Sequence, residues 1–278
     1  MNLQTREADH SVNRFSFFLS AAKTVFTPIA IGFLVYLAWQ SRSELTEILA
    51  NAEPRFLFLS FVLWLLMSLA APVYAIVVFR GLGHEIKFAD AARIHIVNLP
   101  ARYLPGGIWH TVGRVMHYRR VGIGSRELAV FVFLENTLSV TTAFILGGSL
   151  LIAFRGLQEW GGLVSIAVVA STCTLALVPM LLRIRARGNR LSVAPHIYLA
   201  SVFTAALAWC VAASAFVAFV NSVPTLMIDA SNLDVAGTYL VSWGIGFLAI
   251  FAPQGVGVFE VAAAELLRSS AALASIVP

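Results

Sequence analysis

The chain has 278 residues, of which 59% are hydrophobic and only 12% are charged. Because so apolar a chain exposes more hydrophobic surface than one water-soluble core can hide, the composition excludes an ordinary soluble domain and predicts an integral membrane protein. The formal net charge of +5 is best explained by basic loops that face anionic lipid head groups, and nucleic-acid binding is the weaker interpretation.

Residues 1–13 form a polar N-terminal tail, and we expect 14–278 to make up a single transmembrane domain. The apolar run near Arg6, Arg14 and Lys23 has the basic flank of a secretory signal. No convincing small-x-small cleavage site follows it, and the rest of the chain is itself apolar. An uncleaved first helix is therefore the simpler interpretation.

Several stretches of the chain are apolar over lengths close to the roughly 20 residues that cross a bilayer as a helix. The expected spans lie near residues 15–39, 56–79, 128–154, 163–182, 197–220 and 235–252. We therefore predict an all-α fold, a polytopic helical bundle of about six transmembrane helices. Proline and glycine interrupt two further segments, 100–118 and 252–268, which we expect to be re-entrant.

Positive charge gives the expected orientation. If the spans alternate, the N-terminal segment, 80–126 and 183–194 lie on one side and carry three, eight and four Lys or Arg residues. The opposite loops carry three. Because cytoplasmic loops collect Lys and Arg, we expect a multi-pass protein with a cytoplasmic N-terminus.

The first interrupted segment reads YLPGGIWH and ends at His110. The residues expected to form its hinge or re-entrant break are Pro105, Gly106 and Gly107. A helix that resumes after them carries His110 and Arg114 on one face. With Arg102, these side chains suit a lipid phosphate, since cationic groups beside a glycine break hold phosphate well. The alternative is that they only rest among lipid head groups.

Glu135 lies inside the expected span 128–154, where an unpaired charge costs several kcal/mol. It therefore needs a partner or a proton, and Arg114 and Arg102 are the nearest cations by sequence. An Arg–Glu ion pair is the structural explanation. The functional explanation is a carboxylate that lines a substrate path or exchanges protons during transport.

The second interrupted segment, APQGVGVFE, ends at Glu260. The residues expected to form its break are Pro253, Gly255 and Gly257. Glu260 then falls in the first turn of a resumed helix, where the helix dipole stabilises a carboxylate. Glu265 is five residues further and lies off that face, so we expect Glu260 to point at the site. Simple charge complementarity at the helix N-terminus is the alternative.

Broken backbone at membrane depth is tolerated only where protein or a water-filled cavity satisfies its polar groups. Two such breaks at corresponding places in two halves of a chain point to a transport site. Catalytic signals are weak, because the six His residues show no zinc-like spacing and no Gly-x-Ser-x-Gly elbow is present. We predict no metal, no cofactor and no catalytic residue, which favours a function other than catalysis.

The segments YLPGGIWHTVGR and APQGVGVFEVAAAELL resemble the membrane region of the lysylphosphatidylglycerol synthase/flippase superfamily over roughly residues 20–270. The family pattern Pro-x-Gly-[Leu/Val]-Gly-x-x-Glu matches at Pro253, Gly255, Gly257 and Glu260. The first motif departs from the family, which more often continues Pro-Gly-x-Ile-Gly-[Glu/Asp] where this chain has Trp109 and His110. No carboxylate role is carried over at that point.

The resemblance implies a bacterial inner-membrane bundle with re-entrant segments that handles amphipathic lipids. Some members flip an aminoacylated phospholipid between leaflets, and other relatives work beside glycosyltransferases on lipid-linked glycans. Synthesis of a lysyl-lipid needs a soluble domain after the membrane region, and the sequence ends at Pro278 without one. We therefore expect no such synthesis from this chain alone, and we expect it to be short of the family's last helices.

The leading hypothesis is a flippase-like protein that binds or translocates a phosphate-bearing lipid, such as an aminoacylated phospholipid or a lipid-linked glycan. The expected head-group ligands are Arg102, His110 and Arg114, with Glu135 and Glu260 balancing charge. Its expected partners are membrane lipids, anionic inner-leaflet head groups, and a glycosyltransferase or a second copy of the chain.

Two alternatives stay open. One is a membrane-embedded transferase that acts on a lipid-linked sugar, with Glu44, Glu47 or Glu53 as its base. The other is a non-catalytic partner of a glycosyltransferase.

Overall fold

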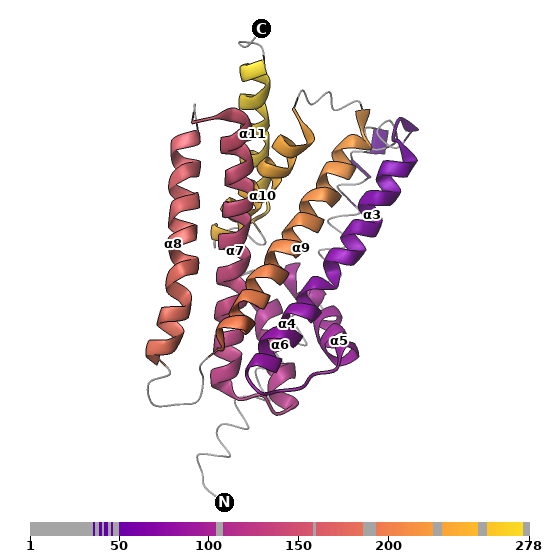
Figure 1. The fold of residues 1–278 in the computed structure, drawn as a ribbon. Coiled ribbons are helices and arrows are strands. Elements are labelled where there is room, and N and C mark those ends of the chain that lie inside the picture. Colours follow the sequence, from indigo (N-terminus) through magenta and orange to yellow (C-terminus); the bar gives the residue numbers. More distant parts are fainter. Residues whose placement is uncertain are drawn as a thin grey trace, which may run out of the picture.

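The computed structural model describes residues 50–103, 108–157, 160–185, 193–224, 230–249 and 255–274, together with 36, 39, 40, 42, 43 and 46. These residues form helices and no strand, which confirms the predicted all-α fold. Figure 1 shows long helices standing roughly side by side, with the short helices α4, α5 and α6 at one end of the bundle and α10 and α11 toward the other.

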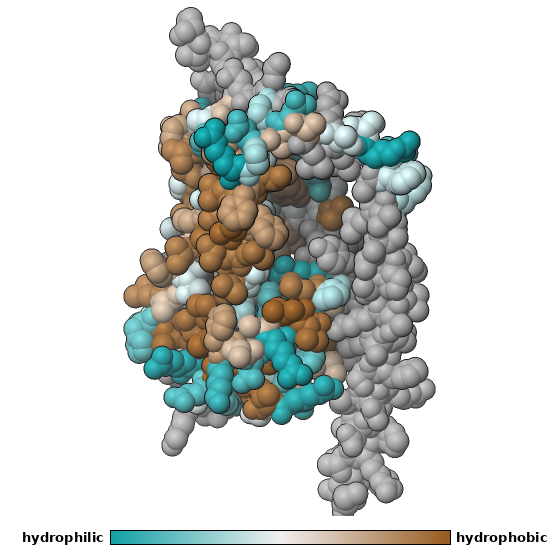
Figure 2. Space-filling view, turned by 90° about the vertical axis from the view of Figure 1, so that its right-hand side faces the viewer, coloured by the Kyte–Doolittle hydropathy of each residue, from teal (hydrophilic) through white to brown (hydrophobic). Residues whose placement is uncertain are grey.

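Four helical stretches are long and apolar enough to cross a membrane. The first, Pro54–Gly81, joins α3 (Pro54–Ser68) and α4 (Ala70–Gly81), and the others are α7 (Ser125–Arg155), α8 (Gly161–Arg185, apolar over Gly161–Leu182) and α9 (Pro195–Asn221). Many large apolar side chains on these helices are exposed, an arrangement that suits lipid rather than water. Figure 2 shows such an apolar band on one face, between more polar residues at the two ends.

These four helices correspond to four of the expected spans, 56–79, 128–154, 163–182 and 197–220. The expected span 15–39 lies almost wholly outside the described residues. The expected span 235–252 corresponds to α10 (Asn232–Leu248), which has 17 residues and is not among the four. At about 1.5 Å per residue it is about 25 Å long, shorter than a hydrocarbon layer of roughly 30 Å.

Helix α7 is the centre of the bundle and packs against α8, α9 and α10. Its approach to α10 is close, because a Cβ at Gly147 would lie 2.6 Å from the Cβ of Leu240 and 2.9 Å from the carbonyl oxygen of Gly237. Toward α8, Gly148 faces the side chain of Val168 in the same way. Small residues at such crossings let helix backbones approach closely within a membrane.

A unit of short helices lies at the end of the bundle where α7 begins (Figure 1). It consists of α5 (Phe88–Asn98), the 3-10 turn η1 (Leu99–Tyr103) and α6 (Trp109–Arg120). Three buried aromatic rings fix it to the bundle: the ring centroid of Phe79 in α4 lies 4.8 Å from Tyr118 in α6 and 4.6 Å from Phe131 in α7. The predicted break at Pro105, Gly106 and Gly107 lies outside the described residues.

Helix α11 (Val258–Ala274) packs along α10. The turn before it contains Gly255 and Gly257, whose φ angles of +72° and +87° favour glycine. Pro253 lies outside the described residues.

One arginine joins this pair of helices to α7. The guanidinium of Arg155 donates to Oδ1 of Asp234 and Oγ1 of Thr238 on α10, and to the carbonyl oxygen of Leu266 on α11. The ion pair is largely buried, with the Arg155 and Asp234 side chains 11% and 6% exposed. It ties the end of α7 to both helices at once.

Candidate functional site

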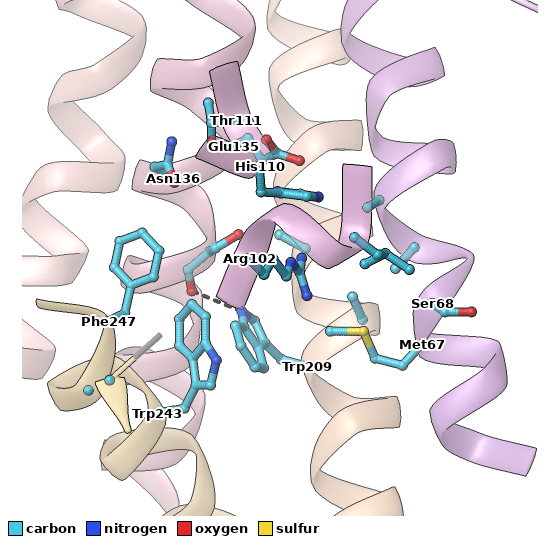
Figure 3. A pocket seen from close by; sticks show the side chains of 18 of the residues that line it. Met67, Ser68, Arg102, His110, Thr111, Glu135, Asn136, Trp209, Trp243 and Phe247 are labelled. Atoms are coloured by element: carbon cyan, nitrogen blue, oxygen red, sulfur yellow. Dashed lines mark hydrogen bonds between the residues drawn. The ribbon is translucent and has the colours of Figure 1, made fainter. Parts of the chain in front are cut away.

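A cavity of about 1020 Å³ lies between the α5–η1–α6 unit and the α10–α11 pair. Side chains from α3, α4, α7 and α9 complete its wall, whereas none of the described side chains of α8 lines it. Figure 3 shows Arg102 reaching into this pocket, with Trp209, Trp243 and Phe247 on one side of it and His110 and Glu135 on the other. The cavity therefore has a polar wall and an aromatic wall.

The structure brings together every side chain that the sequence nominated for binding. The cavity-lining set includes Arg102 from η1, His110 and Arg114 from α6, Glu135 from α7, and Glu260 from α11. These positions belong to four separate elements, so residues from both of the segments that contain proline and glycine line one cavity. Their role as ligands stays a prediction.

Arg114 and Glu135 form an ion pair across α6 and α7. Nη1 of Arg114 donates to Oε1 of Glu135 at 2.8 Å and to Oε2 at 3.0 Å. The guanidinium carbon also lies 5.1 Å from the ring centroid of Phe131. The Arg–Glu pair that the sequence offered as one explanation for Glu135 is thus present, and it offsets the cost of a carboxylate inside a membrane helix.

The two side chains of this ion pair differ in their solvent exposure. The Arg114 side chain is 3% exposed and that of Glu135 is 17% exposed. Nε and Nη2 of Arg114 are buried and make no hydrogen bond to Glu135, and the buried hydroxyl of Tyr118 lies beside the guanidinium. The pair therefore uses only part of the donor capacity of Arg114.

His95 of α5 is a cavity residue that the sequence did not single out. Its ring meets the ring of His110 edge-on, with 5.5 Å between centroids. Burial, followed by the charges of Arg114 and Arg102, lowers the pKa of His95 to about 4. The imidazole is therefore neutral near pH 7. Among the described residues, its Nδ1 and the hydroxyl of Tyr74 are buried without a hydrogen-bond partner, so this wall offers polar groups that a bound molecule can use.

Glu260 has a structural contact as well as a place at the cavity. Its Oε2 accepts a hydrogen bond from the backbone N–H of Gly257 at 2.6 Å, which forms one half of a capping box at the start of α11. The side chain is exposed and lines the cavity, whereas Glu265 pairs with Arg268 away from it. Helix capping and a carboxylate at the cavity wall therefore coexist at this residue.

The aromatic wall was missed by sequence reasoning. The rings of Trp209 and Trp243 have centroids 4.2 Å apart, and Trp243 stacks on Phe247 at 5.1 Å. Nε1 of Trp209 donates to the carbonyl oxygen of Ser139 at 2.9 Å, the dashed line in Figure 3. Aromatic residues within an apolar span resemble ordinary core or lipid-facing residues, so the sequence held no signal that distinguished them.

The site offers charged and hydrogen-bonding side chains. Within the described ranges, no three His, Cys, Asp or Glu side chains are placed to hold a metal ion. Of the glutamates proposed as a transferase base, Glu53 pairs with Arg55 on the surface and does not line the cavity. Glu44 and Glu47 lie outside the described residues.

The resemblance to the lysylphosphatidylglycerol synthase/flippase superfamily rests on two short motifs. No family model, curated protein or solved structure matches the chain, so the family assignment stays a prediction.

Proposed function

We propose that this chain is a flippase-like membrane protein that binds a phosphate-bearing amphipathic lipid in the cavity and moves it between leaflets. The observation that carries the proposal is a single cavity, within a bundle of membrane-length helices, that collects Arg102 and Arg114 with Glu135 and Glu260. Ionisable side chains at membrane depth are costly, and those that line a cavity mark the path of a polar substrate.

Both walls of the cavity suit such a lipid. The phosphate would take charge-assisted hydrogen bonds from Arg102 and Arg114, with His110 beside them. The acyl chains would lie against the aromatic wall formed by Trp209, Trp243 and Phe247 and leave toward the bilayer. A volume of about 1020 Å³ is at the upper end of the range of roughly 300–1,000 Å³ for ligand pockets, enough for a head group and the first part of its chains.

We infer that the α5–η1–α6 unit and the α10–α11 pair are re-entrant segments that enter from opposite sides. They lie toward opposite ends of the bundle (Figure 1) and line the same cavity, and α10 is too short to span on its own. Interrupted helices that meet at a central cavity are the usual construction of a transport site. Movement of one unit against the other would expose the cavity to each leaflet in turn.

The charge distribution supports an orientation in a bacterial inner membrane with the α5–η1–α6 end in the cytoplasm. Arg42, Arg55 and Arg268 are exposed elsewhere, but most exposed basic residues of the described chain lie at that end: Arg80, Lys87, Arg93, Arg119, Arg120 and Arg126. Cytoplasmic surfaces of membrane proteins collect such residues. The lipid would then be taken from the cytoplasmic leaflet, where Arg102 and Arg114 are nearest.

The test is a head-group-resolved leaflet assay in proteoliposomes. Purified protein is reconstituted with labelled phosphatidylglycerol, its lysyl ester or phosphatidylcholine, and the fraction of label reaching the inner leaflet is followed over time. We expect the wild type to accelerate movement of an anionic or aminoacylated lipid, and Arg102→Gln, Arg114→Ala and Glu260→Gln to lose most of that acceleration.

The matched control is Arg268→Gln, because Arg268 is an exposed arginine on α11 outside the cavity. It should move lipid at the wild-type rate, and gel filtration should show equal amounts of folded protein for all variants. If no lipid crosses faster than in protein-free liposomes, the proposal is wrong for this chain alone.

A further inference from the structure

We propose that Glu135 is a proton-binding site coupled to the substrate, so that each phosphate bound at Arg114 enters the cavity together with one proton that Glu135 receives. This inference rests on the proposed function, because it takes the bound anion to be a lipid phosphate. It adds a coupling ion to that function, and its test distinguishes failure of the coupling from failure of the binding.

The first step is a count of charge at the buried pair. One guanidinium neutralises one carboxylate, since Nη1 of Arg114 contacts both carboxylate oxygens of Glu135. The Arg114 side chain is 3% exposed, so water does little to screen additional charge beside it. Arg114 and Glu135 therefore balance each other's charge at this wall of the cavity.

The second step is that Arg114 has N–H donors that Glu135 does not use. Its Nε and Nη2 are buried and make no hydrogen bond to Glu135, the hydroxyl of Tyr118 lies beside the guanidinium, and the residue lines the cavity. The guanidinium has five N–H donors in a planar fork, and its Nε–Nη2 edge matches two oxygens of a phosphate. A phosphate can thus bind Arg114 without removing Glu135.

The third step follows from the charge that such binding adds. The described cavity lining carries two arginines, Arg102 and Arg114, and two carboxylates, Glu135 and Glu260, so a bound phosphodiester adds one uncompensated negative charge. A like charge at close range favours the protonated form of one of the anions. The phosphodiester is the stronger acid and stays ionised. Glu135 is the more exposed member of the pair and lines the cavity, so it can take a proton from cavity water. One oxygen becomes O–H, the other still accepts from Arg114, and net charge is conserved.

Other titratable and charged groups line the cavity or lie close to the pair. They are Tyr74 of α4, His95 of α5, Arg102 of η1, His110 and Tyr118 of α6, Tyr198 of α9, and Glu260 of α11. From α10, Tyr239 lines the cavity, and among the described side chains of α8 no titratable group does so. Of all these, Arg102 is the added cation, and it is the group that could neutralise the phosphate in place of a proton.

Proton uptake on binding is measured by calorimetry. Purified protein in detergent is titrated with dihexanoyl phosphatidylglycerol, a short-chain phosphodiester lipid, in buffers that differ in ionisation enthalpy. The dependence of the observed heat on that enthalpy gives the number of protons taken up. From the charge count we expect about one proton per lipid for the wild type, and none for Glu135→Gln, which should still bind.

The matched control is Glu265→Gln, the same substitution at a surface glutamate outside the cavity, which should keep the wild-type proton count. Inorganic phosphate in a parallel titration separates a free anion from a lipid phosphate, since binding of phosphate alone would assign the site to the free anion. Wild-type binding without proton uptake overturns the coupling and leaves the proposed function standing. If dihexanoyl phosphatidylglycerol does not bind, both the proton coupling and the proposed function are wrong. If Glu135→Gln does not fold, the wild-type proton count still decides.

Discussion

Gly255 lies against the backbone of Gly246, so that a Cβ at position 255 would come within 2.6 Å of the carbonyl carbon and oxygen of Gly246. Gly246 belongs to the last turn of α10, and both glycines line the cavity. The turn into α11 is thus folded tightly onto the end of α10, and this contact shapes one edge of the candidate site.

We expect Gly255→Ala to destabilise the α10–α11 pair through two effects, the positive φ and the steric clash with Gly246. Gly257 has the same backbone requirement, with φ of +87°, but no atom lies within 4 Å of its added Cβ. Gly257→Ala should therefore lower the free energy of unfolding only by the backbone strain of roughly 1–2 kcal/mol. Gly255→Ala should lower it by clearly more. Thermal unfolding in detergent compares the two, and equal midpoints would show that the clash relaxes.

The buried pair of Arg155 and Asp234 should be sensitive to loss of one partner. Arg155→Met leaves the carboxylate of Asp234 buried without its guanidinium, which costs about 3–5 kcal/mol. Arg55→Met removes an exposed ion pair with Glu53, in which the Arg55 side chain is 79% exposed and that of Glu53 is 41% exposed. Its loss should lower the stability by less than about 1 kcal/mol. Unfolding midpoints of both variants check this contrast, and similar losses would contradict it.

Two substitutions of Glu260 should separate its helix-capping role from the role of its charge. Glu260→Gln keeps an oxygen that accepts from the Gly257 N–H, so stability should stay near that of the wild type while lipid movement falls. Glu260→Ala removes the cap as well and should cost about 1 kcal/mol more. Glu265→Ala on the same helix serves as the control in both assays. Equal stability of the Gln and Ala variants would show that the Glu260 side chain does not stabilise α11 as a cap.

Close packing of α7 on α10 predicts a further contrast between glycines. Gly147→Ala places a methyl group 2.6 Å from the Cβ of Leu240 and should separate the two helices, whereas Gly162→Ala on α8 meets no atom within 4 Å. We expect the first variant to lower the unfolding midpoint and the second to leave it unchanged or raise it slightly, since alanine favours helix over glycine. A tolerated Gly147→Ala would show that α10 shifts freely.

The ion pair between Arg114 and Glu135 was within reach of the sequence, because a carboxylate at membrane depth needs a partner and few cations lie nearby. Helix geometry also distinguished Glu260 from Glu265. The contact between Arg155 and Asp234 was not predictable in the same way. They lie 79 positions apart in the sequence, and hydropathy does not indicate which helix ends meet.

The length of α10 and the aromatic wall escaped prediction for a related reason. Apolar residues continue past Leu248, so composition gives no sign that the helix ends there. Trp209 and Trp243 satisfy the same hydropathy pattern whether they face lipid, core or cavity. Tertiary packing alone decides among these, and a single sequence carries little information on it.

The three hydrogen bonds of Arg155 have a mechanical consequence. One guanidinium holds α7, α10 and α11 together, so this half of the protein should rotate as a rigid body during any rearrangement. Deformation would then concentrate where α6 meets α7, at the aromatic cluster of Phe79, Tyr118 and Phe131. In a transport cycle, that cluster would be the pivot of the movement, and Arg155 would keep α7, α10 and α11 together.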